Sequence, residues 1–365
     1  MNTPSSTQRR HRLLGALRDP RAATAGLGPG AWSALVADAR ACNLLGTLAE
    51  VLHQAGADVP PAAARHLLGA RRLAERQRLS VRWEAHALQA ALGGLGVPIV
   101  LLKGAAYVMS PRGLGAGRMF GDIDLLVPRE ALAEVESTLM LDGWVSAKTS
   151  AYDQRYYRQW MHEIPPLTHL RRGTVLDVHH TILPLTARQA PDPRRIVDRA
   201  TPLPGLPALR LPALEDLLIH SLVHLVHEGE LHHALRDLWD IDTMVRVHGA
   251  EDTAFWPRLT GYAVDNDLAG PVGLGLRLAA RLLHTPVPAD VGSTLRALSP
   301  PLWCRPRLEA RYERALPWPG AGDGAAARLQ IYLRAHALRM PLPMLTRHLA
   351  VKAWKGLVGP DPAAG

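Results

Sequence analysis

Three aspartates in the middle of the chain have the side chains and the spacing of a cation site. Asp122 and Asp124 flank one apolar residue, and Asp177 lies in a later apolar stretch. In a β-strand alternate side chains share one face, so the first two carboxylates project together. Carboxylates held this close repel each other unless a cation lies between them, and oxygen ligands completed by substrate phosphates suit Mg²⁺. The pattern therefore predicts a metal–nucleotide site.

Predicted strands would position these carboxylates. Residues 99–102 are apolar and predict one strand, and residues 122–127 predict a second one after a short helix and a glycine-rich loop. Residues 175–182 predict a further strand, in which Asp177 and His179 share a face. If the last two strands are neighbours, Asp177 becomes the third carboxylate of the site.

Two basic residues of this region are candidates for phosphate contacts. Lys103 follows four apolar residues and precedes Gly104, which favours a phosphate contact at the start of a helix over a lysine whose stem covers apolar surface. Arg118 lies among glycines that allow the backbone to approach a ligand closely. An ordinary surface arginine fits the same pattern, so the residues alone leave both interpretations of Arg118 open.

Three histidines form a stripe in the C-terminal half. His220, His224 and His227 are spaced at i, i+4 and i+7, which places them along one side of a helix. No acid or cysteine completes a recognisable zinc signature, so we expect them to line the cleft beside the predicted site rather than to bind zinc. Nearby, Asp237 and Asp240 are expected to form ion pairs within their own helix, with reaching the cleft as the alternative.

The expected fold class is α+β, with a small mixed-sheet core flanked by helical regions and a predominantly helical chain. Ala, Leu and Arg dominate the composition, which favours helices. We expect an N-terminal helical region at 1–95, the core at 96–212 and a C-terminal helical domain at 213–365. The proline-rich stretch 184–213 is expected to be a surface linker. Other elements expected in the core are a helix at 128–141 and strands at 144–148 and 162–170.

Charge and cysteine content indicate a soluble, cytoplasmic protein. The net charge of +9 is concentrated at the ends, with five Arg and one Asp in residues 1–22 and ten Arg plus Lys and four acids in residues 301–365. The two cysteines, Cys42 and Cys304, are too few for a disulfide framework. The N-terminus lacks an apolar signal region, and no later stretch approaches the length of a membrane span.

A basic segment near the C-terminus offers a possible contact surface. Residues 324–357 contain six Arg and Lys and no acid, and Pro341 and Pro343 are expected to divide them into two helices. Such a surface could contact anionic lipid or an acidic partner. We prefer a solvated helix face that closes the C-terminal bundle.

The motifs Leu102-Lys103-Gly104, Arg118 to Asp124, and Leu176-Asp177-Val178-His179 resemble those of the uncharacterised nucleotidyltransferase family of the DNA polymerase beta-like superfamily. The resemblance extends over most of the chain. It implies a minimal αβ nucleotidyltransferase core, a divalent cation, Mg²⁺ or Mn²⁺, and an NTP as donor. In this chain Lys103-Gly104 stands where the superfamily usually has Gly-Ser.

The resemblance also assigns roles to individual residues. Asp122 and Asp124 would bind the metal, and Asp177 would bind metal or deprotonate the attacking hydroxyl. The residues that would contact the nucleotide are Lys103, Gly104, Arg118 and His179.

These patterns together favour an enzyme that moves a nucleoside monophosphate from an NTP to an acceptor hydroxyl and releases pyrophosphate. The alternative is a catalytically weak relative that senses nucleotide or binds a partner. A nucleic-acid-binding regulator is disfavoured, because only the basic charge supports it and no reading motif is present. The acceptor is open between a protein side chain, a metabolite and a natural product, as are base preference and oligomeric state.

Overall fold

A seven-stranded mixed sheet lies in the middle of the chain, with strand order β3-β4-β5-β2-β1-β7-β6. The computed structural model describes residues 5–146, 148, 150–249, 252–318, 324–341 and 343–346. The strands are β1 (Ile99–Leu102), β2 (Ile123–Leu126), β3 (Trp144–Ser146), β4 (Leu167–His169), β5 (Val175–His179), β6 (Thr201–Leu203) and β7 (Leu206–Leu211). The central strand β2 pairs antiparallel with β1 and parallel with β5.

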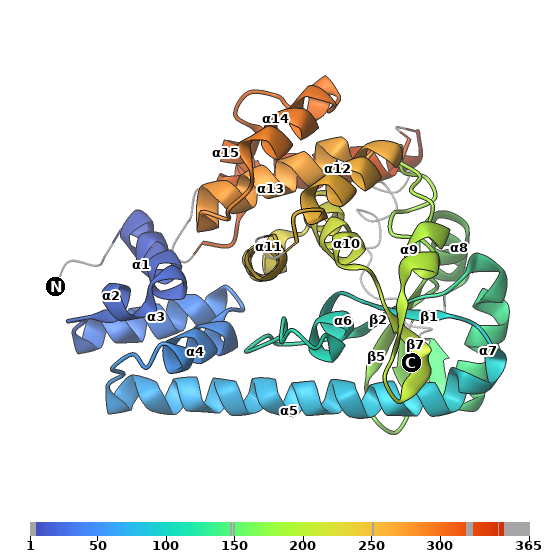
Figure 1. Cartoon of the computed structure of the whole chain (residues 1–365), viewed down its shortest axis with the longest axis horizontal. Helices are drawn as coiled ribbons and strands as arrows, with labels where there is room; N and C mark the ends of the chain where they lie inside the picture. Colours follow the sequence, from blue (N-terminus) through green and yellow to red (C-terminus); the bar gives the residue numbers. More distant parts are fainter. Residues whose placement is uncertain are drawn as a thin grey trace.

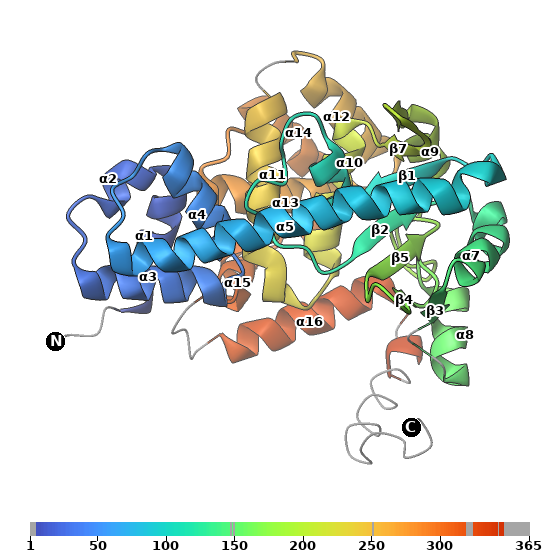
Figure 2. The ribbon, with the colours of Figure 1, turned by 90° about the horizontal axis from the view of Figure 1, so that it is seen from below.

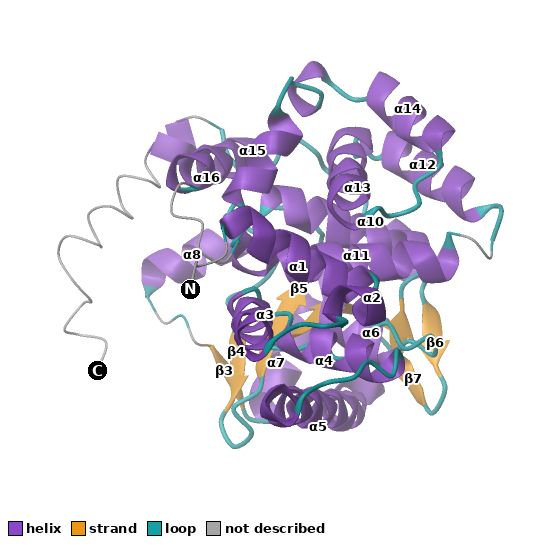
Figure 3. Cartoon of the chain, turned by 90° about the vertical axis from the view of Figure 1, so that its left-hand side faces the viewer, coloured by secondary structure: helices purple, strands orange, loops and turns teal. Residues whose placement is uncertain are grey.

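Helices cover both faces of this sheet. The long helix α5 (Pro61–Leu92) runs along one face, and the C-terminal helices lie on the other (Figures 1 and 3). Figure 2 shows α5 crossing from the N-terminal helices to the sheet. Because β1 and β2 are covered on both sides, every residue of both strands is buried, which explains their continuous apolar pattern.

The remaining α-helices precede, interrupt and follow the strands of the sheet. Before the sheet lie α1 (Ser6–Arg18), α2 (Pro20–Thr24), α3 (Pro29–Ala41) and α4 (Leu45–Gln54). Among the strands lie α6 (Lys103–Met109), α7 (Leu132–Leu141), α8 (Ala151–Trp160) and α9 (Arg194–Arg199). After the sheet come α10 (Leu214–His227), α11 (Ala234–His248), α12 (Phe255–Asp265), α13 (Ala269–Leu283), α14 (Ala289–Ala297), α15 (Leu308–Ala315) and α16 (Ala325–Arg339).

The expected α+β class and the dominance of helix are confirmed. Buried side chains from Leu13 to Ile331 form one continuous hydrophobic core, so helices of both ends pack on the sheet region. The division into three domains stays a prediction. In the part of the chain that the structure describes, no helix is long and apolar enough to cross a membrane.

Two expectations for the core are wrong. The stretch 184–213 is not a linker, because it contains α9 and the paired strands β6 and β7, and β7 pairs in parallel with β1. Within 162–170, only Leu167–His169 forms a strand, and the preceding helix α8 was not expected.

The basic segment 324–357 forms α16 up to Arg339, and its residues 347–357 lie outside the described residues.

Candidate active site

The pairing of β2 with β5 brings the predicted carboxylates together. These strands are parallel neighbours, and the Cα partner of Asp124 is Asp177. Because paired residues of adjacent strands project to the same face, both carboxylates lie on one side of the sheet. Asp122 immediately precedes β2 and is exposed, whereas Asp124 is buried. The expected arrangement, with Asp177 beside the strand of Asp122 and Asp124, is confirmed.

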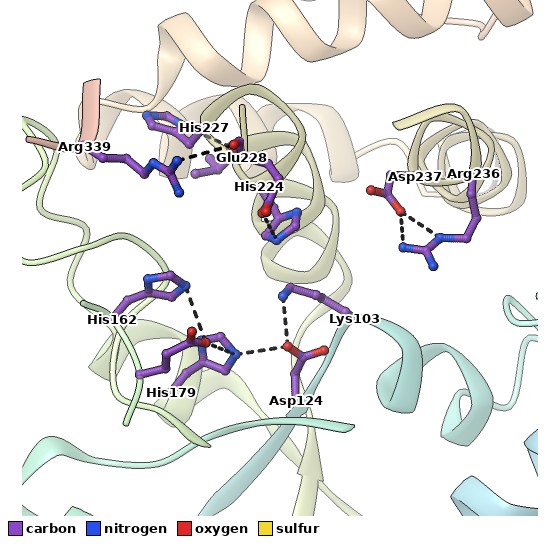
Figure 4. A network of polar contacts seen from close by, with 12 residues as sticks. Lys103, Asp124, His162, His179, His224, His227, Glu228, Arg236, Asp237 and Arg339 are labelled. Carbon is purple, nitrogen blue, oxygen red and sulfur yellow. Dashed lines mark hydrogen bonds and ion pairs between the residues drawn. The ribbon is translucent and has the colours of Figure 1, made fainter. Parts of the chain in front are cut away.

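Two nitrogens hold one oxygen of Asp124. Lys103 Nζ donates to Asp124 Oδ1 at 2.9 Å, and His179 Nε2 lies 3.0 Å from the same oxygen (Figure 4). Burial by itself raises the pKa of the Asp124 carboxyl, but the Lys103 ammonium and His179 outweigh burial and hold that pKa well below its usual range. Burial opposes the charge on Lys103, but the neighbouring carboxylates, Asp124 first, raise the pKa of its ammonium.

Lys103 reaches Asp124 from an unusual backbone conformation. Its φ is 40°, in the left-handed region that residues with a Cβ rarely adopt, and it stands where β1 ends and α6 begins. Strain of this kind persists only where the surroundings enforce it, and it is concentrated at functional sites. The backbone corner therefore directs the ammonium towards the carboxylates.

Asp177 has no such partners. Its Oδ1 is buried and has no hydrogen-bond partner among the described residues. Burial, and next the charges of Asp124 and Asp122, raise the pKa of the Asp177 carboxyl to about 7. Asp122 is exposed as a residue, but the protein around its carboxyl group removes part of its hydration, and this desolvation, with the Asp124 charge next, raises the pKa of Asp122. The Asp124 charge thus acts on both Asp122 and Asp177, and Asp177 presents an unpartnered buried oxygen. Carboxylate oxygens are the ligands that suit Mg²⁺ or Mn²⁺.

Histidines and acids from α10 and the segment before β4 surround these aspartates. The ring of His179 lies 5.1 Å from that of His162 and 6.4 Å from that of His220, between centroids, and His220 lies 6.3 Å from His224. His224 pairs with Glu228 at 2.7 Å. Burial lowers the pKa of His162 and of His220 well below the usual range, so both rings are neutral at pH 7.

His220 and His224 thus lie near the site, and that they line a cleft there stays a prediction, whereas the expectation is wrong for His227. The His227 ring is buried in the helical core, where its Nδ1 lies 2.9 Å from the Val223 carbonyl oxygen and its ring packs against Trp303. The reason is the position along the helix: His227 lies on nearly the same side of α10 as His220 but about 10.5 Å further along its axis, at the C-terminal end, where other helices pack on it.

Glu163 joins the site without having been predicted from the sequence. This residue forms an isolated backbone bridge with His179, and its Oε2 lies 3.4 Å from His179 Nε2 and 3.8 Å from His162 Nε2. Burial, with the nearby Asp177 charge next, raises the pKa of Glu163 well above its usual range. The only signal in the sequence was a His-Glu pair inside a stretch expected to be a strand.

Arg118 is bound to the C-terminal half. Its Nε donates to Asp240 Oδ2 at 2.7 Å, and its guanidinium lies over the rings of Tyr107 and Phe120 at 5.3 Å and 5.0 Å. Asp240 therefore reaches across to the glycine-rich loop, and the expectation of a pair within its own helix is wrong. Such a contact depends on how α11 packs on that loop, which helix spacing does not reveal.

Asp237 behaves as expected, because its Oδ1 accepts from Arg236 at 2.8 Å on the same helix. Gly104 makes room for Arg118: a Cβ at Gly104 would lie 2.7 Å from the Arg118 guanidinium and 2.7 Å from the Phe120 ring. Close packing therefore requires glycine at this corner. The nucleotide contacts expected of Gly104 and Arg118 stay predictions.

A mixed α+β core that carries aspartates side by side on neighbouring strands agrees with the core that the sequence resemblance implied, whereas the corner lysine departs from the usual Gly-Ser. Residues 29–284 match the model of a family described as uncharacterised nucleotidyltransferase. The chain belongs to this family, as its sequence motifs predicted, and is a nucleotidyltransferase.

Two solved structures are similar to part of the chain. The crystal structure of ANT(2")-Ia in complex with adenylyl-2"-tobramycin is 15% identical, with a TM-score of 0.36 over 51% of this chain and 98% of that chain. An antigenic nucleotidyltransferase-like protein from Paracoccidioides brasiliensis is 15% identical, with a TM-score of 0.30 over 53% of this chain and 91% of that chain. No curated protein matches the sequence.

Proposed function

We propose that this protein transfers a nucleoside monophosphate from an NTP to a hydroxyl group of an acceptor in a Mg²⁺-dependent reaction. The observation that supports this proposal most directly is the pairing of Asp124 with Asp177 on neighbouring strands, with Asp122 beside them. Nucleotidyl transfer requires carboxylates that hold a cation against the phosphates, and a base near the attacking oxygen. The three aspartates supply both requirements.

Asp122, Asp124 and Asp177 would hold the ion, Mg²⁺ or Mn²⁺. When bound, the ion neutralises phosphate charge at the reacting phosphorus. Lys103 supplies a fixed positive charge to the same phosphates, because its ammonium stays protonated beside the carboxylates. His179 orients the Asp124 carboxylate through the contact with Oδ1. Arg118 holds the glycine-rich loop against α11 through Asp240, and this fixes the approach to Asp122.

Asp177 would act as the general base. Its Oδ1 is buried and has no partner among the described residues, so it can accept the proton of a hydroxyl placed beside it. The carboxyl has a pKa of about 7 without the ion, and a cation bound beside it would lower that pKa and keep it ionised. In the reaction the acceptor oxygen forms a bond to the α-phosphorus as its proton passes to Asp177. The bond from that phosphorus to the β-phosphate oxygen breaks, and pyrophosphate leaves with the electron pair.

Isothermal titration of each NTP, with Mg²⁺ present, tests the site. We expect wild-type protein to bind at least one NTP and the Asp122→Asn/Asp124→Asn variant to lose that binding. The chain offers a matched control, since Asp265 and Asp267 are exposed and have the same spacing on a distant helix end. Asp265→Asn/Asp267→Asn should bind like the wild type.

Each result has a clear meaning. Binding that the Asp122→Asn/Asp124→Asn variant retains would contradict the assignment of these carboxylates to the metal–nucleotide site. Binding by the wild type without transfer to any acceptor in a screen of hydroxyl compounds would favour nucleotide sensing. The screen should use the NTP that titration identifies as the donor.

A further inference from the structure

A second group of metal ligands adjoins the three aspartates. One ligand atom from each of His162, Glu163 and His179 lies within 4.8 Å of the other two. Glu163 Oε2 is 3.4 Å from His179 Nε2 and 3.8 Å from His162 Nε2. In a tetrahedral zinc site with bonds of about 2.0–2.1 Å, neighbouring ligand atoms are separated by about 3.3 Å. Small side-chain rotations would therefore bring all three ligands into bonding distance.

The backbone holds these three residues in place. The His180 N–H donates to the His162 carbonyl at 2.9 Å, and the Ile164 N–H donates to the Val178 carbonyl at 3.0 Å. Glu163 and His179 form the bridge between these two hydrogen bonds. The segment that carries His162 and Glu163 is thus tied to β5 alongside His179, and ligands on regular, paired backbone are positioned more accurately than ligands on free loops.

The polar atoms of the group are not satisfied by one another. His179 is fully buried, and its Nε2 faces two carboxylate oxygens, Asp124 Oδ1 at 3.0 Å and Glu163 Oε2 at 3.4 Å. One N–H can donate to only one of these oxygens at full strength. His179 Nδ1 and His162 Nδ1 are also buried, without a hydrogen-bond partner in the described part of the chain. A cation between Glu163 Oε2 and the two Nε2 atoms would satisfy the Glu163 carboxylate, which now faces two ring nitrogens at 3.4 Å and 3.8 Å. The two Nδ1 atoms lie on the other side of each ring and are not ligands of this site.

We propose that His162, Glu163 and His179 form a binding site for a divalent transition-metal ion, with Zn²⁺ as the best fit. Two imidazoles and one carboxylate are a ligand set that zinc sites with an open fourth position use. Imidazole nitrogen favours zinc and its neighbours in the first transition row over Mg²⁺, which prefers oxygen ligands. The two sites adjoin at Asp124 but select different ions. Zn²⁺ on His179 Nε2 would take the place of the proton that this nitrogen shares with Asp124 Oδ1 when zinc is absent.

Titration with Co²⁺ tests this proposal, because tetrahedral Co²⁺ replaces Zn²⁺ and has a visible absorption spectrum. Full-length protein, treated with chelator and kept in excess Mg²⁺ without nucleotide, should bind one Co²⁺ that Zn²⁺ displaces. His162→Gln and Glu163→Gln should each weaken binding at least tenfold, since loss of groups behind metal ligands already costs about 10–100-fold. Asp122→Asn should bind Co²⁺ like the wild type.

His86→Gln, which removes an exposed histidine of α5, is the matched control and should leave the Co²⁺ affinity unchanged. Thermal unfolding of each metal-free variant establishes that it is folded. The proposal is overturned if the wild type binds no Co²⁺ under these conditions, or if His162→Gln and Glu163→Gln bind it as tightly as His86→Gln. Because nucleotide is absent, neither result depends on nucleotidyl transfer.

Discussion

Replacement of Asp177 by asparagine should stabilise the metal-free protein at about pH 8 while it removes activity. Burial and the charges of Asp124 and Asp122 raise the pKa of the Asp177 carboxyl to about 7, against about 3.9 in an unfolded chain. The folded protein therefore binds this proton more tightly than the unfolded chain does. Between about pH 4 and pH 7 the contribution of Asp177 to the free energy of unfolding therefore falls as the pH rises.

The size of the effect follows from the same pKa. A difference of about 3 in pKa corresponds to about 4 kcal/mol, which is the upper limit for the cost of ionising Asp177. The Asp177 side chain is only partly buried, and solvent screens part of that cost. We expect Asp177→Asn to raise the free energy of unfolding by about 1–4 kcal/mol at about pH 8. At about pH 4.5, where the folded wild-type carboxyl is protonated but the unfolded one is largely ionised, the difference should fall to about 1 kcal/mol or less.

Urea unfolding in the presence of EDTA, followed by circular dichroism at both pH values, measures this difference. Asp267→Asn is the control, because Asp267 is exposed and its φ of 55° suits asparagine. Nucleotidyl transfer by Asp177→Asn should fall by about 10²–10⁴-fold, the contribution of a general base. The prediction is wrong if Asp177→Asn is less stable than the wild type at about pH 8, or if the change in its free energy of unfolding is the same at both pH values. Either result would mean that ionisation of Asp177 does not destabilise the folded protein.

Three further changes test other parts of the site. Asp240→Asn should cost about 3–5 kcal/mol of unfolding free energy, because it leaves the buried Arg118 guanidinium with only the longer 4.0 Å contact to Asp237. Urea unfolding measures this cost, and a loss below about 1 kcal/mol would show that the Arg118–Asp240 ion pair behaves like an exposed one. Gly104→Ala should cost about 1–3 kcal/mol, since its Cβ would meet Arg118 and Phe120 at 2.7 Å, and an unchanged melting temperature would show that these side chains can move away. Lys103→Met should weaken Mg²⁺–NTP binding by about 10–100-fold in isothermal titration, because a hydrogen bond to a charged group contributes about that much to affinity. If the variant and the wild type bind Mg²⁺–NTP with equal affinity, Lys103 does not contact the phosphates.

The carboxylates were predictable because their arrangement depends on local rules. Alternation along a strand gives Asp122 and Asp124 a common side, and the same rule gives Asp177 and His179 a common face. Whether the two strands were neighbours could only be stated as a condition, since sequence alone does not specify which strands pair. The structure supplied the register.

Other parts of the fold were hidden because their residues contradict local patterns. Strand β7 contains Pro207, which cannot donate to a neighbouring strand, and Arg210, which interrupts the apolar pattern. Its pairing with β1 is a contact between segments far apart in the chain. The ion pair of Arg118 with Asp240 also joins segments that are far apart in the chain. In the sequence, each of these two residues resembles an ordinary charged residue on a loop or helix surface.

The two register-paired carboxylates differ in a way that bears on their proposed roles. Lys103 and His179 both contact Asp124, whereas Asp177 Oδ1 has no hydrogen-bond partner within the described structure. The contacts with Lys103 and His179 hold the pKa of Asp124 well below its usual range, whereas burial, with the charges of Asp124 and Asp122 next, raises the pKa of Asp177 to about 7. Neighbouring groups whose environments separate their pKa values in this manner commonly divide the roles of permanent anion and proton acceptor. This difference supports Asp124 as a metal ligand that stays ionised and Asp177 as the base that takes the proton of the acceptor hydroxyl.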